Sequence, residues 1–172
     1  MVRARRTGSN NSMAFLLSGE RGNDAAQARQ NYRRYLSRHR DRFPTSVYEL
    51  ASSDWYFDPQ DHRCPHDAWL ESFKIIEPST GERREARETS IRIRLLGAYH
   101  DLALEFTYTK VCRYSISSTA CGRGLGDWTY DEFTVDKSGY VVHEIEWGGF
   151  PGESGSRFLI CAVDIQFNSF PL

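Results

Sequence analysis

The densest group of metal-ligand side chains in this sequence is Asp61-His-Arg-Cys-Pro-His-Asp67. It contains His62, Cys64 and His66, and imidazole nitrogen and thiolate sulfur are ligands that Zn²⁺ prefers in tetrahedral sites. Common structural zinc sites also use a closely spaced cysteine pair, which this chain lacks. The alternative is a polar connector in which His66 and Asp67 bond to the backbone. We therefore predict that the protein binds no metal and no cofactor. If a metal were bound, its ligands would be His62, Cys64 and His66.

The tripeptide Tyr99-His100-Asp101 is a second candidate, because a carboxylate beside an imidazole can orient a general base. The residue pattern places it in a turn, where neighbouring side chains rarely point at one another. Asp is also a common turn residue for reasons of backbone hydrogen bonding alone. We interpret the segment as a turn and keep Tyr99, His100 and Asp101 as candidate binding residues.

Acidic and aromatic side chains gather in residues 128–147. Two carboxylates about 5–10 Å apart can catalyse glycoside hydrolysis, but strand alternation places Glu132, Glu144 and Glu146 on a solvent-exposed outer face. The remaining interpretation is a binding surface, in which aromatic rings anchor a partner and carboxylates attract it. Its candidate residues are Trp128, Tyr130, Asp131, Glu132, Glu144, Glu146 and Trp147. His143 shares a face with apolar residues and is expected to be a buried or half-buried, hydrogen-bonded histidine.

The charges of the chain are divided along its length. Residues 1–42 carry ten Arg and three acidic residues, a net charge of +7, whereas residues 43–172 carry a net charge of −8. The net charge of the whole chain is −1, which disfavours a general nucleic-acid-binding protein. An acidic, aromatic body is suited to a basic protein partner.

Cysteine spacing and hydropathy bear on the compartment. The four cysteines are far apart and form no CxxC pair, which favours a reduced, cytoplasmic protein. The apolar run 13–17 is shorter than the roughly 7–15 residues of a secretory signal core. No stretch approaches the roughly 20 apolar residues of a membrane span. We expect a cytoplasmic protein without membrane association, with Met1 and Met13 as candidate start sites.

Two helices are predicted before residue 55. Asn23 or Asp24 is predicted to cap a helix in which apolar and aromatic residues recur at helical spacing to about Arg42, and Pro44 ends the pattern. The sequence Ser46-Val-Tyr-Glu49 has the spacing of a capping box, which predicts a second short helix.

From about residue 68 the apolar residues alternate with a period of two, which is typical of strands. Strands are predicted in 69–77, 90–96, 102–116, 128–135, 140–147 and 157–167. In the first hairpin, pairing Leu95 with Leu104, Ile93 with Phe106 and Ile91 with Tyr108 keeps the apolar residues on one face. Short turns and the absence of βαβ alternation favour an antiparallel meander.

Together these elements predict an α+β fold. An antiparallel meander of about six strands carries an N-terminal helix and a short second helix packed on it. Residues 1–22 are predicted to be a disordered tail and residues 23–172 a single domain.

Four stretches of the sequence resemble a family of small uncharacterised bacterial proteins: HDAWLESFKI (66–75), LLGAYHDLALEFTYTKVCRYSI (95–116), GDWTYDEFTVDKSGYVVHEIEWGG (126–149) and LICAVDIQF (159–167). The resemblance covers about residues 32–167. More loosely, the chain is similar to small α+β immunity proteins that neutralise toxins. The resemblance implies protein binding and carries over no catalytic residue.

The leading hypothesis is therefore a non-enzymatic, immunity-like module that binds a basic protein through its acidic, aromatic sheet surface. One alternative is a small-ligand-binding or hydrolytic protein with a pocket between sheet and helix. Another is the structural subunit of a homo-oligomer. A cavity lined by inward-pointing carboxylates or His would favour the pocket, whereas a filled core with outward-pointing carboxylates would remove it.

Overall fold

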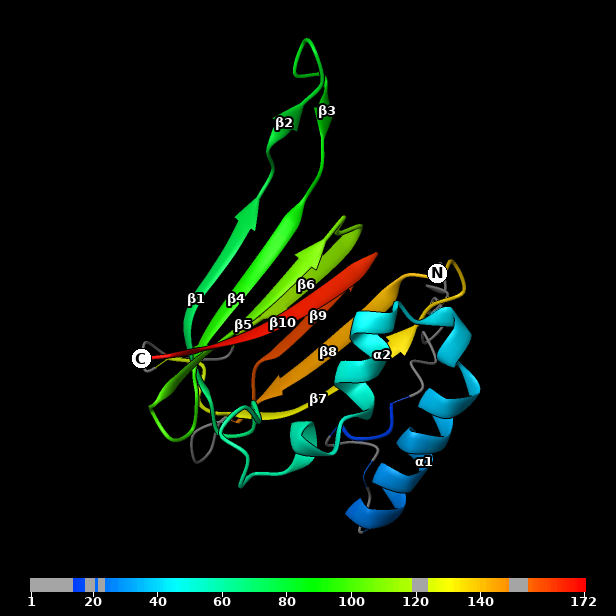
Figure 1. Ribbon diagram of the computed structural model, residues 1–172, viewed down its shortest axis with the longest axis vertical. Helices are drawn as coiled ribbons and strands as arrows, with labels where there is room; N and C mark the ends of the chain where they lie inside the picture. The colour runs from blue at the N-terminus through cyan, green and yellow to red at the C-terminus, as the bar shows by residue number, and fades with distance from the viewer. Residues whose placement is uncertain (1–13, 18–20, 22–23, 119–123, 149–154) are drawn as a thin grey trace, which may run out of the picture.

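The computed structural model of the chain describes residues 14–17, 21, 24–118, 124–148 and 155–172. Within these residues it contains two α-helices and ten strands, and every strand pairing is antiparallel (Figure 1). The predicted α+β class is confirmed. The single six-strand meander is not, because the strands form two four-stranded sheets and one two-stranded sheet. No helix of the described residues is long and apolar enough to span a membrane.

The helical part precedes the sheets. It comprises α1 (Ala25–Arg38), the one-turn helix η1 (Arg40–Arg42), α2 (Thr45–Ser52) and the one-turn helix η2 (Asp54–Phe57). Asp24 caps α1 as predicted, since its side-chain oxygen accepts a hydrogen bond from the N–H of Gln27 at 2.9 Å. The first helix ends at Arg38 rather than at Arg42, and the tighter η1 turn replaces its last predicted residues.

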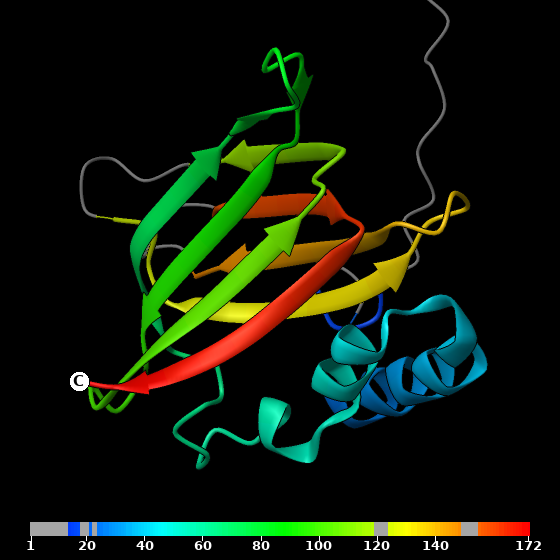
Figure 2. The same ribbon diagram turned by 45° about the horizontal axis from the view of Figure 1, so that its top comes forward.

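The strands are divided between two facing sheets (Figure 2). The first sheet contains, in spatial order, β1 (Trp69–Ile76), β4 (Ser90–Leu96), β5 (Leu102–Thr109) and β10 (Asp164–Pro171). The second contains β6 (Arg113–Ser117), β9 (Arg157–Ala162), β8 (Val141–Trp147) and β7 (Trp128–Val135). The first-hairpin register is confirmed, with Leu95 opposite Leu104, Ile93 opposite Phe106 and Ile91 opposite Tyr108.

The two sheets arise because both long predicted strands break at one corner. Lys110 adopts a left-handed backbone conformation with φ of 51°, which ends β5 before β6 begins. Val163 separates β9 from β10, and its N–H donates to the carbonyl of Thr109 at 3.1 Å. The break at Val163 divides the predicted strand 157–167, and Ile160, which lies opposite the buried His143, and Ile165 are both fully buried.

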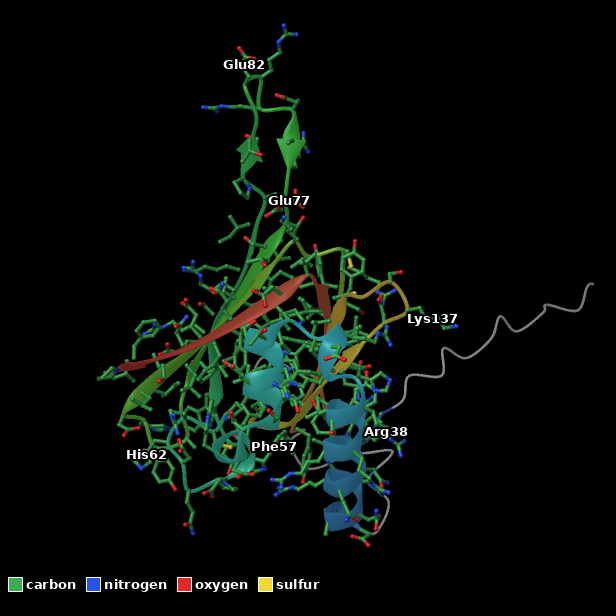
Figure 3. All side chains as sticks on the ribbon, turned by 45° about the vertical axis from the view of Figure 1, so that its right-hand side comes forward. Arg38, Phe57, His62, Glu77, Glu82 and Lys137 are labelled. Atoms are coloured by element: carbon green, nitrogen blue, oxygen red, sulfur yellow. The ribbon has the colours of Figure 1, made fainter. Side chains whose placement is uncertain are left out.

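A small hairpin extends the first sheet. The strands β2 (Ser79–Thr80) and β3 (Ala86–Arg87) pair with each other beyond the ends of β1 and β4. Figure 3 shows Glu77 at the base of this hairpin and Glu82 near its tip, away from the helices. It lies between the predicted strands 69–77 and 90–96, where the period-two pattern predicts no strand.

The core lies between the two sheets and under the helices. The ring of Phe106 in the first sheet stacks on that of Trp128 in the second, with centroids 5.3 Å apart. On the β1 side, the rings of Phe73 and Phe158 meet edge to face at 5.5 Å. Both contacts join the first sheet to the second, so neither sheet buries its apolar face without the other.

Two tyrosines of α1 cover the free edge of β7. The Tyr32 hydroxyl accepts from the N–H of Phe133 at 2.7 Å and donates to its carbonyl at 3.1 Å. The Tyr35 hydroxyl accepts from the N–H of Val135 at 2.9 Å. Because β7 has only β8 as a strand neighbour, these hydroxyls satisfy backbone groups that another chain would otherwise pair with.

We expect Tyr32→Phe to lower the free energy of unfolding by about 1–3 kcal/mol, since it leaves a buried N–H and carbonyl without a partner. Tyr35→Phe should lower the free energy of unfolding by less, because the Tyr35 hydroxyl accepts only one hydrogen bond from the strand. Urea denaturation measures both. Tyr48→Phe is the matched control, since Tyr48 is a half-buried tyrosine of α2 with the guanidinium of Arg40 over its ring. Equal stability of the Tyr32 and Tyr48 variants would contradict the edge-covering role.

Candidate functional site

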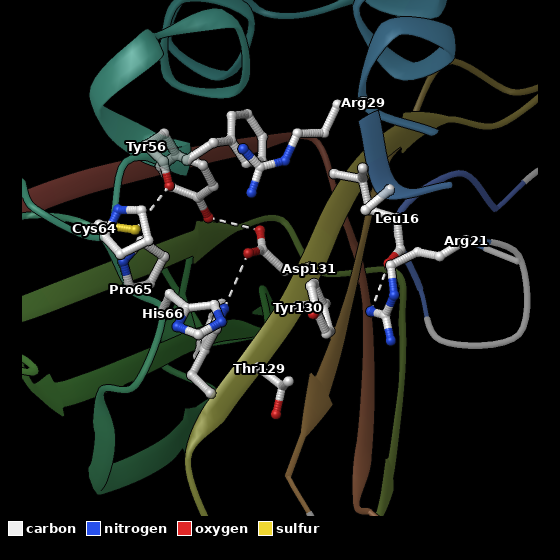
Figure 4. A pocket seen from close by; sticks show the side chains of 14 residues that line it. Leu16, Arg21, Arg29, Tyr56, Cys64, Pro65, His66, Thr129, Tyr130 and Asp131 are labelled. Atoms are coloured by element: carbon white, nitrogen blue, oxygen red, sulfur yellow. Dashed lines mark hydrogen bonds between the residues drawn. The ribbon is translucent and has the colours of Figure 1, made fainter. Parts of the chain in front are cut away.

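A pocket of about 120 Å³ lies beside the start of β7. Its walls come from the N-terminal residues Leu16 and Arg21, from α1, from η2 and the following connector, and from β7. Figure 4 shows Asp131 in the middle of this pocket, with Tyr56 and His66 on one side and Tyr130 on the other. A pocket between sheet and helix, with a carboxylate inside it, is the arrangement that the ligand-binding alternative requires.

A β-bulge turns Asp131 toward this pocket. Trp128 pairs with Trp147 and Tyr130 pairs with Glu146, which leaves Thr129 as the extra residue on β7. After the bulge, Asp131 lies opposite Ile145 on the inner face, and Trp128 also points inward. Simple alternation from Trp128 does not predict this, because the inserted residue reverses the faces.

The Asp131 carboxylate is 6% exposed and accepts three hydrogen bonds. Its Oδ2 accepts from the Tyr56 hydroxyl at 2.7 Å and lies 2.9 Å from His143 Nε2. Its Oδ1 accepts from the indole N–H of Trp128 at 3.0 Å. A carboxylate has about four acceptor positions, so these three bonds leave one position on Oδ1 unused, and Asp131 is one of the residues that line the pocket.

His143 and Tyr108 continue this network into the core. His143 is fully buried, as expected from the sequence, and its Nδ1 lies 2.7 Å from the Tyr108 hydroxyl. Burial raises the pKa of Tyr108 well above 10, so the phenol keeps its proton and needs an acceptor. The assignment that satisfies every group has Tyr108 donating to Nδ1 and a neutral imidazole donating from Nε2 to Asp131.

Glu132 points the opposite way and holds the N-terminal segment. Its Oε2 accepts from the backbone N–H groups of Phe15 and Leu16, both at 2.7 Å. Leu16 and Leu17 are buried, so the described part of the range 1–22 belongs to the folded domain, and the prediction of disorder does not hold there. The remaining residues of that range, with both candidate start sites, lie outside the described residues.

The pKa of Glu132 is raised from 4.5 to about 7. Burial is the largest cause, and the carboxylates of Glu144 and Asp131 add to it. The two N–H donors of Phe15 and Leu16 act in the opposite direction. Its Oε1 is buried without a hydrogen-bond partner among the described residues, which is consistent with a disfavoured charge.

Two guanidinium groups stand at the rim of the pocket. Arg21 lies over the ring of Tyr130, 3.4 Å from its centroid, and donates to the carbonyl of Leu16 at 2.9 Å. Arg29 comes from α1, and Figure 4 shows it reaching toward the pocket from the helix side. Neither guanidinium has a carboxylate partner in the part of the chain that the structure describes. Cationic side chains at an aromatic pocket suit an anionic group.

The predicted acidic surface is only partly a surface. Trp128, Asp131, Glu132 and Trp147 are buried, whereas Tyr130, Glu144 and Glu146 are half-buried and Tyr99, His100 and Asp101 are exposed. The expectation that Glu132 faces solvent is wrong, because residues 15–17 cover that face of β7. Glu146 is paired with Arg157 at 3.2 Å. The second hairpin therefore contributes few of its carboxylates to a docking surface.

The connector 61–67 distributes its ligand-type side chains rather than gathering them. His62 bonds Asp101 at 2.6 Å and stacks on Tyr99, while Cys64 is buried and its thiol donates to the carbonyl of Tyr56 at 3.2 Å. His66 lies at the pocket instead. Among the residues that the structure describes, no group of three or more His, Cys, Asp or Glu could hold a metal ion.

Of the three turn residues, Tyr99 and Asp101 share His62 as a partner, and His100 does not. His100 contacts the ring of Trp69 rather than Asp101, with centroids 4.8 Å apart. His66 Nδ1 is 3.1 Å from Asp67 Oδ1, but it makes no hydrogen bond with any described residue. Its ring meets Tyr130 edge to face at 5.9 Å, on the wall of the pocket.

Sequence reasoning did not assign Tyr56, Tyr108, Arg21 or Arg29 to a site. Tyr56 belongs to an aromatic run that is common at a helix-to-sheet junction, and Arg29 resembles any solvated helix residue. These residues are brought together only where η2, α1 and β7 pack against one another around the pocket. No local pattern marks that meeting.

No protein-family model, curated protein or solved structure matches this chain.

Asp131→Asn is expected to lower the free energy of unfolding by about 3 kcal/mol. The three partners of Asp131 all donate hydrogen bonds, so the NH₂ group of the new amide would face a donor and leave it without an acceptor. Chemical denaturation measures the change. Asp127→Asn, an exposed carboxylate just before β7, is the matched control and should stay within about 0.5 kcal/mol of the wild type. A loss below about 1 kcal/mol for Asp131→Asn would contradict the network.

Glu132→Gln is expected to change how stability depends on pH. The pKa of Glu132 is higher in the folded protein, so its contribution is most favourable below pH 4.5 and is lost as the pH rises through about 7. The wild type should therefore lose on the order of 3 kcal/mol relative to Glu132→Gln across this range. Denaturation at a series of pH values measures it. Glu49→Gln, on the exposed side of α2, should follow the wild-type profile.

Proposed function

We propose that this protein binds a small molecule in the pocket beside β7, and that the ligand combines an apolar, flat body with an anionic group. The observation that carries the proposal is the pair of guanidiniums, Arg21 and Arg29, at the rim of a pocket walled by Tyr56, Phe57 and Tyr130. Guanidinium groups bind carboxylates and phosphates through paired N–H donors.

The size of the pocket supports a small ligand. Its volume of about 120 Å³ is slightly below that of an engineered cavity of about 150 Å³ that binds benzene. One ring or a short aliphatic chain therefore fits inside, with charged groups at the mouth. Pockets of this kind hold their ligands by apolar contact and orient them through a few polar groups.

Arg21 is already held in place before any ligand arrives. Its stacking on Tyr130 and its bond to the carbonyl of Leu16 fix the plane of the guanidinium. A fixed group loses less conformational entropy when it binds than a freely rotating one does. The N-terminal segment thus contributes both the position of Arg21 and, through Leu16, a wall of the pocket.

Binding is favoured over the hydrolytic form of this hypothesis. Asp131 and Glu132 are neighbours on a strand and point to opposite faces, Asp131 inward and Glu132 under the N-terminal segment. They therefore do not flank one substrate as the two carboxylates of a glycosidase do. The protein-docking and homo-oligomer hypotheses stay predictions, and buried Trp128, Glu132 and Trp147 no longer support the first of them.

The test uses 4-methylbenzoate as an anionic probe and 4-methylbenzyl alcohol as its neutral counterpart. The readout is the indole N–H resonance of Trp128 in a two-dimensional ¹H–¹⁵N NMR spectrum, because that group bonds Asp131 at the pocket. We expect the anion to shift this resonance and the alcohol to bind at least tenfold more weakly.

Arg29→Ala should weaken binding of 4-methylbenzoate about tenfold, since one charge-assisted contact is lost. Arg34→Ala is the matched control, because Arg34 is an exposed arginine of α1 that bonds Asn31 instead. The proposal fails if neither probe shifts the Trp128 resonance, or if the Arg29 and Arg34 variants bind the anion equally well.

A further inference from the structure

We infer that the ligand of this pocket is a small zwitterion, whose ammonium group binds Asp131 while its anionic group binds a guanidinium of the pocket wall, Arg21 or Arg29. This inference rests on the proposed function and adds a second recognition point to it. Two observations support it: the Asp131 carboxylate has no Lys or Arg partner among the described residues, and one of its hydrogen-bond acceptor positions is unused.

The first step concerns the charge of Asp131. Its three hydrogen-bond partners are a phenol, an indole and an imidazole. The hydroxyl of Tyr108 needs His143 Nδ1 as an acceptor, and the hydrogen-bond assignment that satisfies every group then has the imidazole donating only from Nε2. No Lys or Arg among the described residues forms an ion pair with Asp131, so its buried negative charge is stabilised by neutral donors alone.

The second step concerns what a buried charge needs. A carboxylate taken out of water is costly unless an opposite charge and hydrogen bonds replace the solvent. Three neutral donors supply part of that replacement, and one lone-pair position on Oδ1 is unused. An ammonium group has donors and no acceptor, so it matches this position in both charge and hydrogen bonding.

The third step concerns the surroundings of that position. The rings of Tyr56, Trp128 and Tyr130 line the pocket around Asp131, and Phe57 adds a further apolar wall. Aromatic faces attract cations, and more strongly where water is excluded. Anionic and cationic groups of the protein therefore stand at different places in one pocket, with Asp131 in the middle and Arg21 and Arg29 on different sides of it (Figure 4).

The two charge types also select against simpler molecules. A carboxylic acid without an amine leaves Asp131 without its cation, and an amine without an acid leaves the two guanidiniums without their anion. Each mismatch costs the interaction at one end while the burial of the apolar body is kept. A ligand that carries both groups is the class that satisfies the whole pocket.

The experiment uses a series of probes on one ring. 4-(Aminomethyl)benzoate carries both charges, 4-methylbenzoate lacks the ammonium group, benzylamine lacks the carboxylate, and 4-(hydroxymethyl)benzoate replaces the ammonium with a neutral donor. Dissociation constants come from titrations of the Trp128 indole resonance. We expect the zwitterion to bind at least tenfold more tightly than each of the other three.

Asp131→Asn should abolish the preference for the zwitterion over 4-methylbenzoate, measured as the ratio of their two dissociation constants in the same variant. Asp127→Asn is the matched control and should keep the tenfold preference. If Asp131→Asn does not fold, the wild-type protein still tests the inference. 4-(Aminomethyl)benzoate must then bind more tightly than 4-(hydroxymethyl)benzoate, because the gain in affinity has to come from the positive charge and not only from a hydrogen-bond donor.

The outcomes separate this inference from the proposed function. If 4-methylbenzoate binds and the added ammonium brings no gain, the zwitterion is excluded and the anion pocket stands. A gain that survives in Asp131→Asn would also overturn the assignment to Asp131. If no probe that carries a carboxylate binds, the proposed function and this inference fail together.

Discussion

The buried carboxylate of Asp131 ties the parts of this protein together. It accepts hydrogen bonds from η2 through Tyr56, from β8 through His143 and from its own strand through Trp128, and His143 extends the network to β5 through Tyr108. A buried charge is tolerable only when such partners are all in place. The two sheets and the helical layer must therefore assemble around one group, which couples the formation of the core to the formation of the pocket.

The bulge at Thr129 makes that arrangement compatible with the strand. It reverses the alternation of β7, so that Trp128 and Asp131 both point inward and Glu132 points outward. The outward face then needs a cover, which residues 15–17 provide, with the N–H groups of Phe15 and Leu16 donating to Glu132. One inserted residue thus positions the polar centre of the pocket on one face of the strand and the attachment of the N-terminal segment on the other.

The charge division along the sequence takes on a more local meaning in the folded molecule. Among the basic residues near the N-terminus, Arg21 and Arg29 stand at the rim of the pocket that contains Asp131. Among the acidic residues of the second hairpin, Asp131 and Glu132 are buried and Glu146 is paired with Arg157. Arg21, Arg29 and Asp131, which are far apart in the sequence, therefore line one small pocket.

Local patterns determined the α+β class, both helices, the cap at Asp24, the pairing of Ile93 with Phe106 and the burial of His143, because these depend on periodicity and on nearest neighbours. Only the tertiary structure decided the break of two strands at Lys110 and Val163, the bulge at Thr129 and the cover over Glu132. Each of these satisfies backbone or carboxylate groups through residues distant in the sequence. Alternation along one strand carries no record of a distant partner, which is why the ligand-type residues could be found from the sequence but their shared pocket could not.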